Sequence, residues 1–198
     1  YMNNKLCLNG EWKLYYALEN SQMADDLQYL RENGEKIEAQ VPGNVELDLY
    51  RAGKEPDPFW GENIYLYRKY EFYRWQFERT FTAPARSSSR QVLVFEGLNN
   101  FADIYLNDEW VADCANSLIA HRVDLTDHLR YGEENHLTVR IRSAANEVRK
   151  MDIPAYVRTH ENGHFMMLRM PASSFGWDIM GRFPSAGMWR GVYLEEEK

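Results

Sequence analysis

Trp75-Gln76-Phe77-Glu78-Arg79-Thr80-Phe81 places large apolar side chains at alternate positions, with polar side chains between them. Alternation with a period of two is typical of a half-buried antiparallel strand, because successive side chains point to opposite faces of a sheet. The segment from Leu8 to Tyr16 follows the same pattern after a turn at its start. Both segments are therefore predicted to be strands with one face toward a core.

Further strand-like segments follow along the chain at residues 37–41, 92–95, 102–106, 109–112, 118–123, 137–141 and 192–194. Asn107-Asp108 separates two of them, and both residue types tolerate the positive φ of a tight hairpin turn. About eight strands with turn signals between them predict an all-β fold, a β-sandwich of the jelly-roll type. A chain of 198 residues is long enough for one such domain, which we expect to span residues 1–198.

Short helices are expected between some of the strands. Ser21 is a candidate N-cap for a helix that ends at Gly34, and Asn44 is a candidate N-cap for a helix over 45–51. A one-turn helix is expected at 125–129. Residues 144–188 form a long stretch in which only 144–151 looks helical, and a loop of this length in a compact domain is usually functional or disordered.

Charge and composition limit the partners. The net charge of −7 disfavours a nucleic-acid partner, which needs clustered positive charge. No run of eighteen apolar residues is present, so no membrane span is expected, and no signal peptide is recognised. The compartment stays open, with a periplasmic or secreted location among the alternatives.

Cys7 and Cys114 lack metal spacing and are expected to be two buried free thiols, although one bridge between them stays open.

The run from Phe175 to Gly191 contains two Trp, one Asp, two Arg and four Gly. Aromatic rings cover the apolar face of a sugar, while carboxylates and guanidinium groups bind its hydroxyls. This run is therefore a candidate carbohydrate site. The alternative is a glycine-rich turn whose two Trp side chains pack in the core.

Other catalytic chemistry finds little support in the sequence. Residues 160–164 match the His-Glu-x-x-His pattern of zinc hydrolases, but their central Asn-Gly favours a turn over the helix that this site needs. The Gly-x-Ser-x-Gly pattern of a serine nucleophile is absent around Ser173-Ser174. No metal site, no cofactor and no catalytic residue are predicted.

Ten segments in order resemble the N-terminal sugar-binding domain of glycoside hydrolase family 2, most of all its β-mannosidase branch. They are 9–12, Val41-Pro42-Gly43-Asn44-Val45, 49–53, 56–63, 75–81, 94–98, 102–107, 121–125, Phe175-Gly176-Trp177-Asp178 and 187–192. The resemblance implies a galactose-binding-domain-like sandwich that sits against an immunoglobulin-like domain and a catalytic TIM barrel. A barrel needs about 250 residues, so this chain is expected to lack both other domains and to be inactive alone.

In that family the N-terminal domain lends a loop to the active site of the barrel of an exo-acting, retaining β-glycosidase. The resemblance implies that Trp177 and Asp178 bind the terminal sugar of a substrate and that Asn63 reaches the same rim. Arg169 and Arg182 are expected to hold the Asp or the loop, and Arg182 is also counted among the substrate-binding residues. Trp189 and Arg190 are expected to be structural, with Trp189 in the sandwich core. The implied partners are a sugar or oligosaccharide and the downstream barrel.

One departure from the pattern leaves the sugar open. The β-mannosidase loop usually reads Trp-Asp-Trp-Gly-Pro-Arg, whereas this chain reads Trp177-Asp178-Ile179-Met180-Gly181-Arg182. A β-galactosidase, β-glucuronidase or exo-glucosaminidase relative is therefore an alternative to a β-mannosidase. Two other functions also stay open: a free-standing lectin-like module, and a structural domain without sugar contact.

Overall fold

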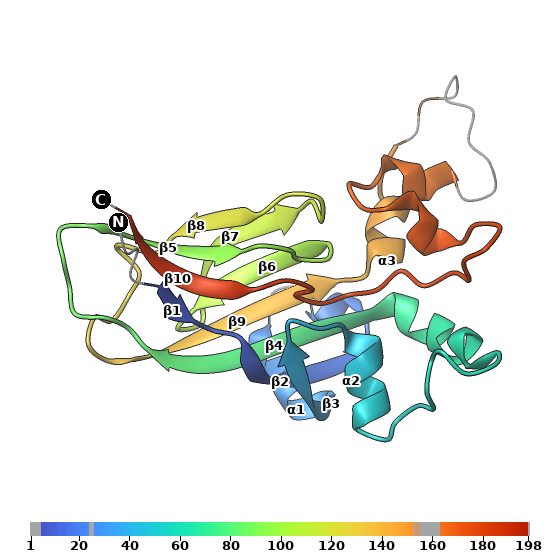
Figure 1. The fold of residues 1–198 in the computed structure, drawn as a ribbon, viewed down its shortest axis with the longest axis horizontal. Helices are drawn as coiled ribbons and strands as arrows, with labels where there is room; N and C mark the ends of the chain where they lie inside the picture. The colour runs from blue at the N-terminus through green and yellow to red at the C-terminus, as the bar shows by residue number, and fades with distance from the viewer. Residues whose placement is uncertain (1–4, 24–25, 153, 155–162, 198) are drawn as a thin grey trace.

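The computed structural model describes residues 5–23, 26–152, 154 and 163–197. Two antiparallel sheets lie face to face as a sandwich (Figure 1). In spatial order, the larger sheet contains β3 (Glu35–Val41), β2 (Gly10–Leu18), β4 (Tyr73–Thr82), β9 (Glu134–Arg142), β6 (Phe101–Leu106) and β7 (Glu109–Ala115). The smaller sheet contains β1 (Lys5–Cys7), β10 (Val192–Glu197), β5 (Arg90–Phe95) and β8 (His121–Asp124). The predicted all-β sandwich is confirmed, with ten strands in the described residues rather than about eight.

The core lies between the two sheets. Alternate residues of β4 point inward, so Trp75 and Phe77 are 2% and 1% exposed. From the other sheet, Leu93 and Phe95 on β5 and Leu194 on β10 join the same cluster. Period-two patterning therefore gives each sheet one apolar face, and burial of these faces against each other holds the layers together.

The opposite face of β4 is also buried, which corrects the prediction of a half-buried strand. Arg74, Gln76 and Glu78 are all below 7% exposed. The turn η1 (Ser21–Met23) and the helix α1 (Leu27–Asn33) cover this face. Arg74 donates to the carbonyl oxygen of Met23 at 2.9 Å, and Gln76 donates to that of Leu27 at 3.1 Å. The polar side chains are thus buried because the covering segment accepts their hydrogen bonds.

The capping residues read from the sequence predict the correct bounds for α2 but the wrong start for α1. Helix α2 (Val45–Arg51) has the predicted bounds, and the Asn44 side chain accepts from the Leu47 N–H at 3.0 Å. Helix α1 ends before Gly34 as predicted, but its N-cap is Asp26 rather than Ser21. The Asp26 side chain accepts from the Gln28 N–H at 2.8 Å and caps the helix, which therefore begins at Leu27.

Other elements differ from expectation in smaller ways. The expected one-turn helix at 125–129 is a single turn over 126–128, closed by a hydrogen bond from the Leu129 N–H to the Leu125 carbonyl at 3.1 Å. The Asp124 carboxylate accepts from the Thr126 N–H at the start of this turn, as an N-cap does. Strand β8 begins only at His121. Both cysteines are free thiols, and Cys114 is buried as expected whereas Cys7 is exposed.

The long segment after β9 lies at one end of the sandwich, and the outer ends of β1 and β10 lie at the other (Figure 1). This segment contains α3 (Ala144–Arg149), as predicted, and the short 3-10 helices η3 (Gly163–Met167) and η4 (Ala172–Phe175). The 3-10 segment η2 (Asn63–Phe72) lies at the same end. All the predicted site residues belong to this end of the molecule.

Candidate functional site

Trp177 and Asp178 lie on a tight turn that projects from the end of the sandwich. The Trp177 N–H donates to the Met180 carbonyl at 2.9 Å, and the Met180 N–H donates back at 3.1 Å. This pairing leaves Asp178 and Ile179 at the tip. Trp177 is 69% exposed and Ile179 is 88% exposed. Among the described residues, Asp178 has no hydrogen-bond or ion-pair partner, so its carboxylate is free to accept from a ligand.

The base of this turn, in contrast, is firmly packed. Phe175 is 1% exposed, and its ring stacks on that of Phe165 with centroids 3.8 Å apart. On the returning side, Phe183 packs edge-on against Tyr67 at 5.9 Å, and its N–H donates to the Ser174 carbonyl at 2.7 Å. A tip with exposed side chains on a packed base is pre-organised to present those side chains.

Arg182 directs its guanidinium into this base. Nε lies 2.8 and 2.9 Å from the two carboxylate oxygens of Glu71, and Nη2 lies 2.7 Å from Oε2. The same group lies over the rings of Phe165 and Phe175, at 4.4 and 5.2 Å. The Arg182 side chain is 17% exposed and that of Glu71 is 5% exposed. These contacts fix the turn to η2, and they engage the Nε and Nη2 donors of the guanidinium.

Asn63 lies in the neighbouring loop at the start of η2. Its amide Nδ2 donates to the Asp57 carbonyl at 2.9 Å, which holds the loop closed. The next residue, Ile64, contacts Gly181 so closely that a Cβ on Gly181 would lie 3.1 Å from Ile64 Cδ1. The structure therefore brings the Asn63 loop and the Trp177-Asp178 turn together.

Large apolar side chains are exposed around the two loops. They comprise Phe59, Trp60, Tyr65 and Leu66 from the first loop and η2, and Trp177, Ile179 and Met180 from the turn. Phe59 and Trp60 are 82% and 77% exposed. We call these seven residues the apolar rim. An exposed apolar group of this size marks an interaction surface.

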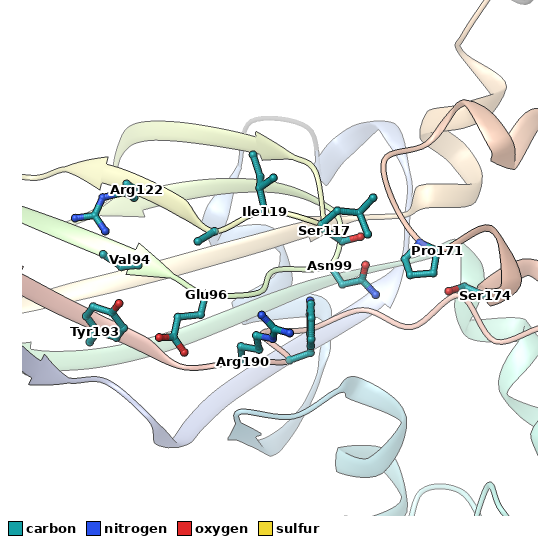
Figure 2. A pocket seen from close by; sticks show the side chains of 13 residues that line it. Val94, Glu96, Asn99, Ser117, Ile119, Arg122, Pro171, Ser174, Arg190 and Tyr193 are labelled. Atoms are coloured by element: carbon teal, nitrogen blue, oxygen red, sulfur yellow. The ribbon is translucent and has the colours of Figure 1, made fainter.

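Trp189 was predicted to lie in the sandwich core, and this prediction is wrong. Trp189 is 42% exposed and lines a concavity of about 880 Å³ on the outer face of the smaller sheet (Figure 2). Met188, its neighbour, takes the core position and is fully buried. Trp189 precedes β10, so the alternation that buries Val192 and Leu194 does not extend to it, and its side chain faces outward. Sequence reasoning also missed Glu96, which lines the same concavity.

Most of the His-Glu-x-x-His segment, residues 160–162, lies outside the described residues. Within the described part of the chain, no three His, Cys, Asp or Glu side chains gather as a metal site would require. Within those same residues, no helix has both the length and the apolar character to cross a membrane.

The sequence model of the glycosyl hydrolase 2 galactose-binding-domain-like family matches residues 20–190. The chain belongs to this family of domains. It is 32% identical over 167 residues to β-mannosidase B of Thermothelomyces thermophilus. The aligned region covers 79% of this chain and 19% of that enzyme. The resemblance to family 2 and its β-mannosidases is confirmed.

Solved structures agree with this assignment. A β-D-mannosidase from Dictyoglomus thermophilum superimposes with a TM-score of 0.82 at 31% identity, over 98% of this chain and 22% of that one. A β-glucuronidase from Ruminococcus gnavus superimposes with a TM-score of 0.62 at 14% identity, over 98% and 29%, which shows a shared fold alone. The chain therefore spans roughly a fifth of the length of the mannosidases it matches.

Proposed function

We propose that this chain is the accessory domain through which an exo-acting, retaining β-mannosidase-like glycosidase completes the terminal-sugar end of its active site. The observation that carries the proposal is the free carboxylate of Asp178 beside the exposed ring of Trp177, on a turn with a packed base. The carboxylate would accept hydrogen bonds from sugar hydroxyls, and the indole would form an apolar wall against the ring.

The apolar rim supports a protein partner around this turn. Its side chains are exposed in the chain alone, and a catalytic barrel docked there would bury them. The same docking would place Trp177 and Asp178 at the edge of the barrel's active site. In this arrangement both catalytic carboxylates belong to the barrel, and the chain alone is expected not to hydrolyse glycosides.

The contacts of Arg182 support a positioning role for this residue rather than a direct sugar contact. Its Nε and Nη2 donate to Glu71, and its guanidinium lies over the rings of Phe165 and Phe175. Asn63 has a side-chain oxygen with no partner among the described residues at the edge of the apolar rim, because only its Nδ2 is engaged there. We therefore assign Trp177 and Asp178 the sugar contacts and Asn63 a place on the same rim.

The test is Asp178→Asn in the longer enzyme that contains this domain. The substitution keeps the shape of the side chain but weakens its hydrogen bonds to hydroxyls, so kcat/KM is expected to fall by at least tenfold, or about 1.4 kcal/mol. The matched control is Asp127→Asn. Asp127 has a side chain that is 87% exposed, on the turn between β8 and β9 at the other end of the sandwich (Figure 1).

An unchanged kcat/KM in Asp178→Asn, with the unfolding midpoint preserved, would refute the active-site role and leave a structural domain. The sugar itself is identified by assaying the longer enzyme on a panel of aryl β-glycosides. We expect the β-mannoside to be hydrolysed fastest, and preference for a galactoside, glucuronide or glucosaminide would assign the chain to another branch.

A further inference from the structure

We propose that the concavity walled by Trp189, Arg190 and Glu96 is a second carbohydrate site, which binds a neutral hexopyranose unit of a glycan. We call it the Trp189 pocket. It lies on the outer face of the smaller sheet, because Val94 and Tyr193 line it while their neighbours Leu93 and Leu194 point into the core. Its volume of about 880 Å³ is large enough for one or two sugar rings.

Trp189 is fixed in place from one side by Gly97. A Cβ on Gly97 would lie 2.6 Å from Cε2 of the Trp189 indole, so the ring packs directly on the backbone of Gly97, just after the end of β5. On its other side, the Arg190 guanidinium lies 4.3 Å from the ring centroid. A guanidinium stacked on an aromatic ring loses little further freedom when its N–H groups bind a ligand. The pocket therefore holds a pre-organised donor.

Glu96 supplies an acceptor beside this donor. Its backbone N–H donates to the Gly191 carbonyl at 3.0 Å, so the two residues face each other across β5 and β10. The Glu96 carboxylate comes so close to Gly191 that a Cβ there would lie 2.9 Å from Oε2. Figure 2 shows Glu96 and Arg190 side by side on one wall of the pocket.

Two of the three charged side chains that line the pocket have no ion-pair partner among the described residues, which suits a neutral polyol. Within the described residues, neither Glu96 nor Arg190 forms an ion pair, although both are exposed. The other cation of the pocket, Arg122, is already bound by Glu195 and Glu197. One free donor group and one free acceptor group can bind neighbouring hydroxyls of one ring. A carboxylated sugar would be attracted by Arg190 but repelled by Glu96.

The remaining walls suit the less polar side of a sugar ring. Ile119, which is 54% exposed, lies on the wall opposite Glu96, and Pro171 closes one end (Figure 2). Ser174 stands next to Pro171 and offers a hydroxyl. An apolar wall facing a donor and an acceptor is the arrangement expected for a ring with one C–H face and a polar edge.

The Trp189 pocket is separate from the turn that carries Asp178. None of residues 177–180 lines the pocket, whereas Ser174 of η4 lines it and Phe175 is buried. The two sites can therefore be tested independently. The pocket is also complete within this chain, whereas the turn is proposed to need a barrel, so the pocket alone would allow the chain to bind sugar as a lectin-like module does.

The experiment is a titration of the 198-residue chain with methyl mannoside, mannobiose and glucuronate. Binding is measured by calorimetry and by the change in tryptophan fluorescence. We expect the neutral sugars to bind with dissociation constants in the millimolar range. Glu96→Gln and Arg190→Gln should each weaken binding at least tenfold, and both should fold normally because these side chains are exposed. Asp178→Ala is the control and should leave the affinity unchanged.

Three outcomes would overturn the proposal. They are the absence of saturable binding by any neutral sugar, affinity unchanged in Glu96→Gln, and binding lost in Asp178→Ala. Tighter binding of glucuronate than of methyl mannoside would overturn the assignment to neutral sugars. Asp178→Asn tests the active-site proposal by kcat/KM in the longer enzyme, whereas Glu96→Gln tests the pocket by sugar binding to the chain, so a failure here is distinguishable from a failure of the active-site proposal.

Discussion

Arg182 and Glu71 form a two-pronged ion pair between residues 111 positions apart in the chain, with both side chains mostly buried. The pair joins the returning arm of the 176–181 turn to η2. Because the guanidinium also lies over Phe165 and Phe175, one side chain connects three separate segments of the site. The position of the turn therefore depends on a contact that lies beneath it rather than in it.

We predict that Arg182→Ala lowers the free energy of unfolding by about 2 kcal/mol, because it removes the nearer of the two arginines that pair with the buried Glu71 carboxylate and leaves only Arg68, at 3.8 Å. Arg182→Lys should cost less, since it keeps the charge but loses the two-pronged geometry and the stacking. The control is Arg86→Ala, whose side chain is 69% exposed and 3.8 Å from its partner, and it should cost less than about 0.5 kcal/mol. Urea unfolding measures all three, and equal losses for Arg182→Ala and Arg86→Ala would contradict the prediction.

A second prediction concerns pH. Burial raises the pKa of Glu46 to about 8, the nearby charge of Asp48 acts in the same direction, and the hydrogen bond from Ser185 at 2.6 Å opposes it. The unfolded carboxyl has a pKa near 4.5. At a pH between these two pKa values, Glu46 is protonated in the folded chain and ionised in the unfolded chain, so unfolding releases a proton. The free energy of unfolding is therefore expected to fall as the pH rises through this window.

Glu46→Gln should remove this loss and make the chain more stable than the parent at pH 8, by on the order of 3 kcal/mol. Burial also raises the pKa of Asp48, to about 6, so Asp48 contributes to the same slope only at lower pH. The comparison is therefore made between pH 6 and pH 8, by chemical unfolding of both proteins. A slope that persists in Glu46→Gln would show that another group titrates.

A third prediction concerns Gly187, which has a φ of +137° where the chain passes α2. A Cβ at this position would lie 2.9 Å from the Gly43 carbonyl oxygen and 3.0 Å from Asn44 Cα. Gly187→Ala is expected to cost more than about 3 kcal/mol, because both the backbone angle and the contact oppose it.

Gly132→Ala is the matched control for Gly187→Ala. Gly132 also has a positive φ, +71°, but nothing lies within 4 Å of the position that a Cβ would occupy there. It should therefore cost only about 1 kcal/mol, from the backbone angle alone. Thermal unfolding distinguishes the two costs, and similar values would mean that the close approach to Gly43 is easily relaxed.

Sequence patterns predicted those parts of the fold that depend on neighbours along the chain. Asn44 caps α2 and Gly53 follows it, so the bounds of this helix could be predicted from two local signals. Asn107 and Asp108 both adopt the positive φ that was expected of the hairpin. Each of these features results from a residue's own backbone preference, which acts in any fold.

Features that depend on distant segments could not be predicted in this way. Gln76 reads as a solvent-facing residue, and only the covering α1 makes it buried. Trp189 reads as a core residue, but the concavity beside it is formed by strands and loops that meet only in three dimensions. Likewise, nothing near Glu71 in the sequence indicates its pairing with Arg182. Trp177 and Asp178 were selected by a family resemblance, and their sugar contacts stay a prediction.

Strand β10 is the last strand of the residues that the structure describes, yet it lies inside its sheet between β1 and β5. During synthesis on the ribosome, the smaller sheet therefore cannot close until residues up to Glu197 have emerged. We expect removal of the chain from Val192 onward to leave an unfolded chain by circular dichroism, whereas removal of the chain up to Cys7, which deletes the edge strand β1, should leave a folded one. Any excised form of this domain must consequently keep its final strand, even though the loops of interest lie at the far end.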